Sequence, residues 1–268
     1  MTFDTAKLGT VERDVTYCTI DDQALKLDLY YPPTEGPWPV LIFVHGGAWS
    51  AGDKSALPVN PAEAGYLVAS LDYRLYPAHR FPAMIEDVKC AIRYLRAHAS
   101  AYALDPERIA LVGHSAGGHL VALAGLADES TGWDVGPYLD QSSRVQAVIP
   151  MAAPTDLTRP YPAEIEELLD GVFGPEQRAC AGPVNHVRPD APPFMIIQGE
   201  EDTLVPVEQA HLLHEALMNV GAPSELIVME HAGHGFEPVG GTPTPSMDQI
   251  LAMMLTFLSK MSVSPPAR

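Results

Sequence analysis

A serine lies between glycines in the segment 113–118, which reads Gly-His-Ser-Ala-Gly-Gly. An apolar run precedes this segment and a helix-forming run follows it, so Ser115 stands where a strand passes into a helix. Glycines at 113 and 117 allow the sharp turn that lifts a serine hydroxyl clear of a sheet, because side chains there would collide with neighbouring backbone. The motif alone also fits an ordinary glycine-rich connection. In this setting the pattern G-x-S-x-G predicts that Ser115 is a nucleophile for acyl transfer.

A serine hydroxyl is a weak nucleophile until a base takes its proton, and a carboxylate must orient that base. Asp202 lies in the polar turn 199–206, directly after an apolar run, and is our candidate for the carboxylate. His234 lies in the glycine-containing segment 231–236, after the next apolar run, and is our candidate for the base. The order Ser, Asp, His therefore predicts a triad in which His234 takes and returns the proton and Asp202 fixes its tautomer.

Acyl transfer also needs hydrogen-bond donors at the position where the carbonyl oxygen becomes negative. The segment 45–49, His-Gly-Gly-Ala-Trp, follows an apolar run, and its glycines let the backbone approach a substrate closely. We predict an oxyanion hole made by the backbone N–H groups of Gly47 and Ala48, together with that of Ala116 after the nucleophile.

Three nearby side chains have less certain roles from the sequence. Trp49 fits either a wall of the acyl pocket or buried packing, and both interpretations stay open. His114 precedes the nucleophile, and we expect it to line the substrate pocket with Trp49. His45 is expected to brace the oxyanion loop rather than transfer protons.

The elements that would position these residues follow from the alternation of apolar runs with helical patterns. This alternation predicts an α/β domain spanning residues 1–268, with a mainly parallel sheet and helices on both faces. The pattern favours a small lid at 155–190, which is rich in Pro, Glu and Gly and contains a short helix at 163–169. The predicted strands cover about 11–19, 24–31, 40–45, 66–72, 108–113, 145–151, 193–198 and 224–230. The predicted helices cover about 82–99, 115–127, 206–220 and 246–261.

The composition of this chain limits the classes of partner that it is expected to bind. A formal net charge of −18 argues against nucleic acid and anionic membranes. No signal peptide or membrane span is visible, and three cysteines in unrelated contexts fit a reducing compartment, so we expect a cytoplasmic protein without disulfides. We expect these cysteines to be buried small side chains.

The sequence contains no phosphate-binding loop, dinucleotide fingerprint or zinc-protease pattern, so no cofactor and no metal are expected. The oligomeric state stays open, with a homodimer as one alternative.

Several segments, in this order, resemble the α/β-hydrolase superfamily. They are 45–49, 71–75 with 81–83, 113–118 and the turns that carry Asp202 and His234. Within the superfamily, the chain is similar to the hormone-sensitive-lipase-like esterases and to small bacterial carboxylesterases of the feruloyl-esterase-like type. This resemblance implies the α/β-hydrolase fold with an eight-stranded sheet. The chain departs from the lipase-like pattern in having Ala48-Trp49 where three glycines are usual, and in a short N-terminal part. The form H-G-G-x-W also resembles the kynurenine formamidases.

The residues and the resemblance together favour a serine hydrolase that cleaves carboxylic esters of small acyl or aryl type through an acyl-enzyme. An arylformamidase that acts on N-formylkynurenine-type amides is a second hypothesis, because of the Trp49 segment. A ligand receptor without activity is a third, since folds of this kind are reused for binding. In the first hypothesis the partner is a small-molecule ester.

Overall fold

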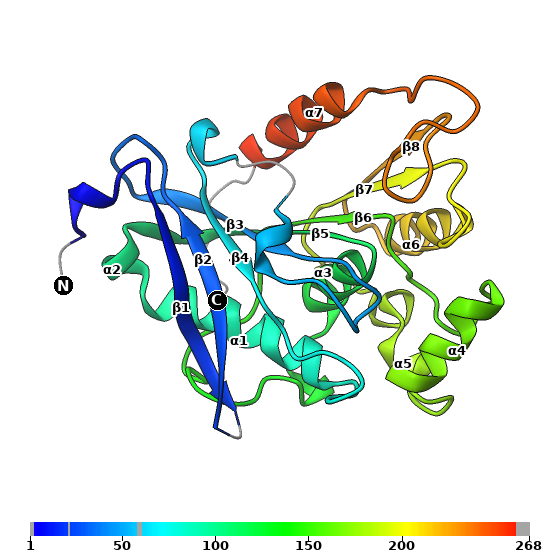
Figure 1. Cartoon of the computed structure of the whole chain (residues 1–268), viewed down its shortest axis with the longest axis horizontal. Coiled ribbons are helices and arrows are strands. Elements are labelled where there is room, and N and C mark those ends of the chain that lie inside the picture. The colour runs from blue at the N-terminus through cyan, green and yellow to red at the C-terminus, as the bar shows by residue number, and fades with distance from the viewer. Residues whose placement is uncertain (1–2, 21, 58–60, 261–268) are drawn as a thin grey trace.

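The computed structural model describes residues 3–20, 22–57 and 61–260. Its centre is an eight-stranded sheet with the strand order β1-β2-β4-β3-β5-β6-β7-β8 (Figure 1). Strands β1 and β2 pair antiparallel, β2 also pairs antiparallel with β4, and the remaining pairs are parallel. The strands are β1 (Val11–Ile20), β2 (Gln23–Tyr30), β3 (Trp38–Val44), β4 (Leu67–Leu71), β5 (Leu104–His114), β6 (Ala147–Met151), β7 (Phe194–Gly199) and β8 (Ser224–Met229).

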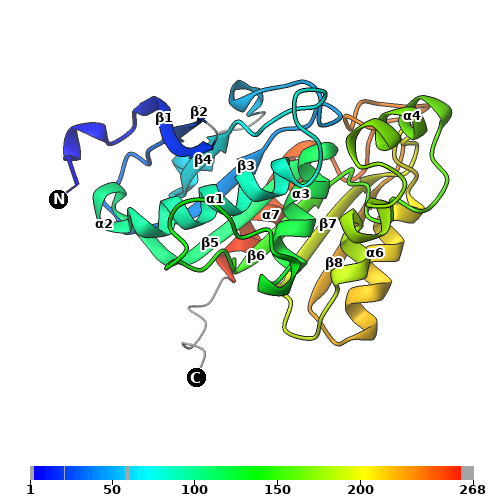
Figure 2. The ribbon, with the colours of Figure 1, turned by 90° about the horizontal axis from the view of Figure 1, so that it is seen from below.

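Helices cover both faces of the sheet. Helices α1, α3 and α6 lie on one face and α7 lies on the other (Figure 2). Helix α7 begins with a capping box, in which Ser246 and Gln249 satisfy each other's backbone N–H groups. The helices are α1 (Ala83–Ala97), α2 (Ala99–Tyr102), α3 (Ala116–Leu126), α4 (Ala163–Val172), α5 (Arg178–Ala181), α6 (Glu208–Asn219) and α7 (Met247–Ser259).

The central strands β3 and β6 are apolar along their whole length because both faces of the sheet are covered there. In β3, Val40 and Ile42 belong to the core under α1 and α3, whereas Leu41 and Phe43 belong to the core under α7. Successive strand residues point to opposite faces, so one continuous apolar run fills two hydrophobic layers.

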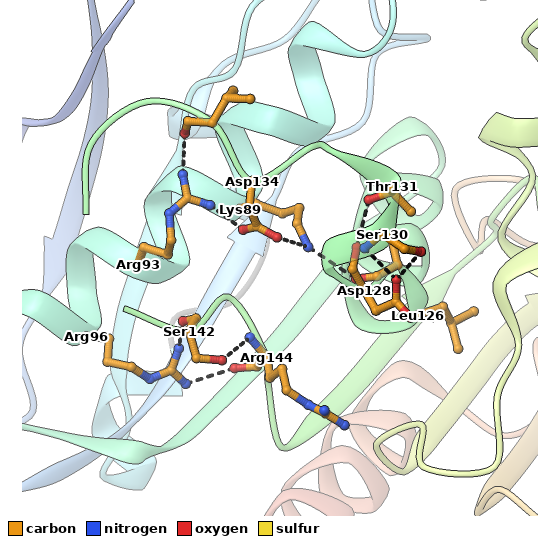
Figure 3. Close-up of polar contacts among 12 residues, drawn as sticks. Lys89, Arg93, Arg96, Leu126, Asp128, Ser130, Thr131, Asp134, Ser142 and Arg144 are labelled. Atoms are coloured by element: carbon orange, nitrogen blue, oxygen red, sulfur yellow. Dashed lines mark hydrogen bonds and ion pairs between the residues drawn. The ribbon is translucent and has the colours of Figure 1, made fainter. Parts of the chain in front are cut away.

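Cationic side chains of α1 hold the connection 127–146, which joins α3 to β6 (Figure 3). Lys89 and Arg93 are both 1% exposed, and both form ion pairs with Asp134. Arg96, three residues farther along α1, donates to backbone carbonyls near the end of this connection, including one at 2.8 Å. Charges at this spacing lie on one side of a helix, so they pin a long connection to α1 and leave its buried charges paired.

The predicted fold class is confirmed, and the predicted strands and long helices are present with shifted ends. Strand β5 starts four residues before the predicted 108, because Leu104 still pairs with Trp38 of β3. The short helices α2 and α5 were not predicted. The cysteines are free thiols, but the prediction that all are buried is wrong for Cys180, which is exposed on α5. Within the described ranges, no helix has the length and apolarity needed to cross a membrane.

Candidate active site

Ser115 lies at the turn between β5 and α3 and has a strained backbone. Its φ is 57° and its ψ is −120°, a conformation that L residues rarely adopt. The neighbouring glycines explain how the chain makes this turn. A Cβ atom at Gly113 would lie 2.4 Å from the carbonyl oxygen of Gly117, and one at Gly117 would lie 2.0 Å from the carbonyl oxygen of Val44. Only glycine fits at these positions, so the local sequence builds the predicted sharp turn between strand and helix.

The structure brings Ser115, His234 and Asp202 together although the first two are separated by 119 positions. The Ser115 hydroxyl lies 2.9 Å from His234 Nε2, and His234 Nδ1 lies 2.7 Å from Asp202 Oδ2. A carboxylate can only accept, so Nδ1 carries the proton and Nε2 is free to accept from the serine hydroxyl. This geometry suits transfer of a proton from Ser115 to His234.

Asp202 is 7% exposed and is held by several donors besides His234. Its Oδ1 accepts from the backbone N–H groups of Leu204 and Val205, each at 2.9 Å. Its Oδ2 accepts from the side-chain amide of Gln198 at 2.9 Å. Burial raises the pKa of Asp202, but hydrogen bonds from the His234 ring and from backbone N–H groups outweigh it and lower this pKa below its usual value. The carboxylate is therefore ionised and fixed in orientation.

Gln198 was missed in the sequence analysis. It lies near the end of β7, is 1% exposed and also donates to the carbonyl of Val205 at 3.0 Å. A buried amide needs partners, and the carboxylate four positions later is one of them. The signal in the sequence is a single polar residue at the end of an otherwise apolar strand.

The loop that carries His234 is held by His114 and by a hydrogen bond within the loop. The His114 ring donates from Nε2 to the backbone carbonyl of His234 at 2.8 Å, and the two ring centroids are 5.0 Å apart. The His114 ring also meets Phe236 edge-on. Within the loop, the Glu237 carboxylate accepts from the N–H of Gly235 at 2.8 Å. The ring nitrogen of His114, which we predicted in the substrate pocket, is thus engaged by the backbone of His234.

The segment predicted to form the oxyanion hole has an unusual backbone. The φ angles are 110° at Gly47 and 55° at both Ala48 and Trp49. A Cβ atom at Gly47 would lie 2.2 Å from the carbonyl oxygen of Ala51, so this position also requires glycine. In the part of the chain that the structure describes, no hydrogen bond uses the N–H of Gly47, Ala48 or Ala116 as donor. These donors are therefore available to an oxygen of a bound molecule.

His45 and Trp49 flank this loop and are both buried. The His45 ring stacks on Tyr73 with centroids 4.3 Å apart, and the Tyr73 hydroxyl donates to the His45 carbonyl at 3.1 Å. His45 is thus held against Tyr73, and its role as a brace of the loop stays a prediction. Trp49 is 2% exposed, and its indole N–H donates to His119 Nδ1 at 3.2 Å. Buried packing is one of the two interpretations that the sequence left open for Trp49.

With this geometry established, the chain can be compared with known proteins. Residues 27–217 match the family model described as BD-FAE. The chain belongs to the BD-FAE family. Among solved structures, this BD-FAE protein is similar to a truncated carbohydrate esterase from gut microbiota (TM-score 0.81, 28% identity, 97% of this chain and 99% of that chain). It is also similar to the propionate-bound esterase 2 of Thermogutta terrifontis (TM-score 0.80, 29% identity, 97% and 98%). These similarities confirm the α/β-hydrolase fold.

Two relatives in Mycobacterium tuberculosis are similar in sequence to this BD-FAE protein. Esterase LipC is 36% identical over 88% of this chain, and the probable carboxylic ester hydrolase LipM is 34% identical over 81%. The matched regions cover 62% of LipC and 54% of LipM, so the chain spans little more than half the length of these relatives. In the described residues of this BD-FAE protein, no group of His, Cys, Asp or Glu side chains is arranged to hold a metal ion.

Proposed function

We propose that this protein is a carboxylic ester hydrolase that works through an acyl-enzyme intermediate. The observation that carries the proposal is the continuous hydrogen-bond chain from Ser115 through His234 to Asp202. A nucleophile, a base within reach of it and a carboxylate behind the base are the parts that acyl transfer requires. The names of LipC and LipM, which describe those proteins as an esterase and a probable carboxylic ester hydrolase, support the same reaction here.

In the first half of the reaction, Ser115 Oγ attacks the ester carbonyl carbon while its proton passes to His234 Nε2. Asp202 stabilises the imidazolium that forms, because its ionised carboxylate accepts from Nδ1. The carbonyl oxygen becomes negative and accepts from the N–H groups of Gly47, Ala48 and Ala116. His234 then gives its proton to the alkoxide oxygen, the alcohol leaves and the acyl group remains on Ser115.

The second half of the reaction repeats these steps with water. His234 Nε2 takes a proton from a water molecule, whose oxygen attacks the acyl carbon of the Ser115 ester. The same oxyanion donors stabilise the second tetrahedral intermediate. The proton returns from His234 to Ser115 Oγ, the carboxylic acid is released and the free serine is restored.

We infer that the substrates are esters of small acyl or aryl groups. The insertion 155–190 adds only the short helices α4 and α5 and one short 3-10 helix, Pro183–His186, which makes a modest lid. The Thermogutta esterase 2, at 28–29% identity, has been solved with propionate and with butyrate bound, which supports short acyl chains here. Trp49 and His114 would border this pocket while they hold the loops beside it.

The test compares kcat/KM for p-nitrophenyl butyrate and N-formylkynurenine, with Ser115→Ala as the blank. The proposal expects the ester to be preferred by orders of magnitude and the blank to be inactive. Preference for the formamide would establish the arylformamidase alternative instead. An inactive wild type that still binds esters would indicate a receptor. Activity that rises steadily with acyl length beyond about C10 would overturn the preference for small acyl groups.

A cytoplasmic location and a homodimer are further parts of this proposal. Strand β8 lies at one edge of the sheet and offers a surface for a second copy. Fractionation of cells and light scattering on the purified protein test these two points.

A further inference from the structure

A buried histidine connects the oxyanion loop to the insertion. His119 lies on α3, one helical turn after Ser115, and is 0% exposed. Its Nδ1 lies 3.2 Å from the indole Nε1 of Trp49, and its Nε2 lies 2.8 Å from the carbonyl oxygen of Ala181. The proposed mechanism uses neither of these contacts.

The partners of His119 determine its protonation state. A carbonyl oxygen can only accept, so Nε2 carries a proton; an indole N–H can only donate, so Nδ1 is an acceptor. His119 is therefore a neutral imidazole with both nitrogens satisfied. Burial is the main cause that lowers the pKa of His119 to about 4, which agrees with this neutral form.

Three segments of the chain converge on this imidazole. Trp49 comes from the oxyanion loop, and its ring meets the His119 ring edge-on with centroids 5.3 Å apart. Phe173, directly after α4, packs against both of these rings, at 5.1 Å from Trp49 and 5.5 Å from His119. Ala181, at the end of α5, supplies the carbonyl acceptor. The insertion and the oxyanion loop are thus in contact through the helix of the nucleophile.

The backbone beside Trp49 explains why this contact matters. Ala48 and Trp49 both have a φ of 55°, where an L residue is strained by about 1–2 kcal/mol. Such strain persists only where the surrounding structure holds the residue in place. The indole bond to His119 supplies one anchor, and a backbone bond from the N–H of Tyr76 to the Trp49 carbonyl, at 2.9 Å, supplies another. The N–H of Ala48, a proposed oxyanion donor, lies in the anchored turn.

We propose that His119 is a positioning residue that holds the Trp49 indole and thereby fixes the oxyanion donors, with the insertion as its outer support. This inference rests on the proposed esterase function. It assigns no proton transfer to His119. Loss of the indole bond should reduce stabilisation of the transition state more than binding of the ester, because the donors act on an oxygen that becomes negative only during reaction.

The experiment is a double-mutant cycle on kcat and KM with p-nitrophenyl butyrate. His119→Phe keeps a ring but removes both hydrogen bonds, and Trp49→Phe removes the indole donor. We expect each to lower kcat by about tenfold or more, since small misplacements of catalytic groups are costly, and His119→Phe to leave KM within about twofold because His119 does not border the pocket. The double variant should be little slower than either single variant, because both remove one interaction. His119→Gln, which can accept and donate, should recover most of the lost rate.

The chain offers matched controls in a second histidine and tryptophan pair. His186 Nε2 lies 2.6 Å from the carbonyl oxygen of Cys180, next to the acceptor of His119, and its ring meets Trp133 edge-on. His186→Phe and Trp133→Phe change the same kinds of side chain without touching Trp49, so both should keep kcat within about threefold of wild type. If His119→Phe does not fold, Trp49→Phe and His119→Gln carry the test.

An unchanged kcat in His119→Phe or Trp49→Phe would overturn the proposal, and so would single-variant losses that multiply in the double variant. An equal loss in His186→Phe would also overturn the proposal, because it would indicate a general effect of changes in the insertion.

The indole N–H resonance of Trp49, assigned with Trp49→Phe, reports the hydrogen bond to His119 independently of any activity measurement. A shift of this resonance in His119→Phe, in a protein that cleaves no ester, would uphold the contact and reject the esterase function.

Discussion

The imidazole of His114 donates a hydrogen bond to the backbone carbonyl of His234, with a distance of 2.8 Å between Nε2 and the oxygen. His114 is the residue before Ser115, so the proposed nucleophile and the proposed base are joined by a second, non-reacting link. Burial lowers the pKa of His114 and keeps this ring neutral beside the ring that must become an imidazolium. The contact therefore fixes the distance between the reacting groups without adding a competing positive charge.

This link predicts the behaviour of variants at position 114. His114→Ala frees the loop of His234, and we expect kcat/KM to fall by about tenfold or more because the base is held less firmly. His114→Gln keeps a donor and should retain most of the activity. Steady-state kinetics on p-nitrophenyl butyrate measure both variants. Equal activity of His114→Ala and wild type would show that the other contacts of the loop are sufficient.

Replacement of the carboxylate tests the orientation of the base. Asp202→Asn places an amide N–H group opposite His234 Nδ1, the nitrogen that donates in the wild type. The amide favours the tautomer in which Nδ1 is unprotonated, and this is the wrong tautomer for accepting a proton from Ser115. We expect kcat to fall by about 10⁴, a magnitude known from the same change in serine proteases. Glu201→Gln is the matched control, since Glu201 is an exposed carboxylate in the same turn. A comparable loss in the control would place the essential charge elsewhere in the turn.

The sharp turn at Ser115 includes a position, Gly117, that we expect to tolerate no side chain. Gly117→Ala would bring a methyl group within 2.0 Å of the carbonyl oxygen of Val44, in the neighbouring strand β3. We expect the free energy of unfolding to fall by about 1–3 kcal/mol or more, measured by urea denaturation. Gly132→Ala is the comparison, because its φ is 74° but nothing lies within 4 Å of the added atom. It should show only the strain of the backbone, about 1 kcal/mol.

The buried imidazole of His119 predicts how stability depends on pH. Its pKa is about 4 in the folded chain and 6.5 ordinarily, so the unfolded chain binds a proton first as the pH falls. Stability is unaffected by this residue above pH 6.5 and is lost progressively between pH 6.5 and 4. Between pH 7 and pH 5, wild type should lose about 1–2 kcal/mol more than His119→Gln. Urea denaturation at the two pH values gives this difference, and equal losses would contradict the assignment of a neutral, buried His119.

The sequence predicts some residues of the candidate site and not others, because only some of them occupy positions that a regular pattern specifies. Ser115, Asp202 and His234 each follow an apolar strand, and the carboxyl ends of parallel strands meet at one edge of a sheet. Their convergence can therefore be predicted without coordinates. His119 also lies in an apolar helix, but its role depends on Trp49, which is 70 positions away, and on a carbonyl in an irregular segment. No periodicity specifies where such a segment passes.

The insertion 155–190 is a second case in which the sequence predicts only part of the structure. Its helix at 163–169 was predicted from composition, and α4 extends to Val172. The short helix α5 is tied to the rest of the insertion by Arg178, which forms an ion pair with Glu166 at 2.7 Å. Contacts of this kind follow from the folded arrangement, not from local propensity.

The proposed catalytic groups all follow β3, β5, β7 or β8, whereas β1 and β2 lie at the opposite edge of the sheet from β8. This division affects how a library of variants should be screened. We expect changes in β1 and β2 to alter how much folded enzyme a culture yields, and to leave the turnover number of each folded molecule equal to that of the parent. A screen that reads total hydrolysis in a lysate would mix the two quantities, whereas titration of the reactive serine with an organophosphate would separate them.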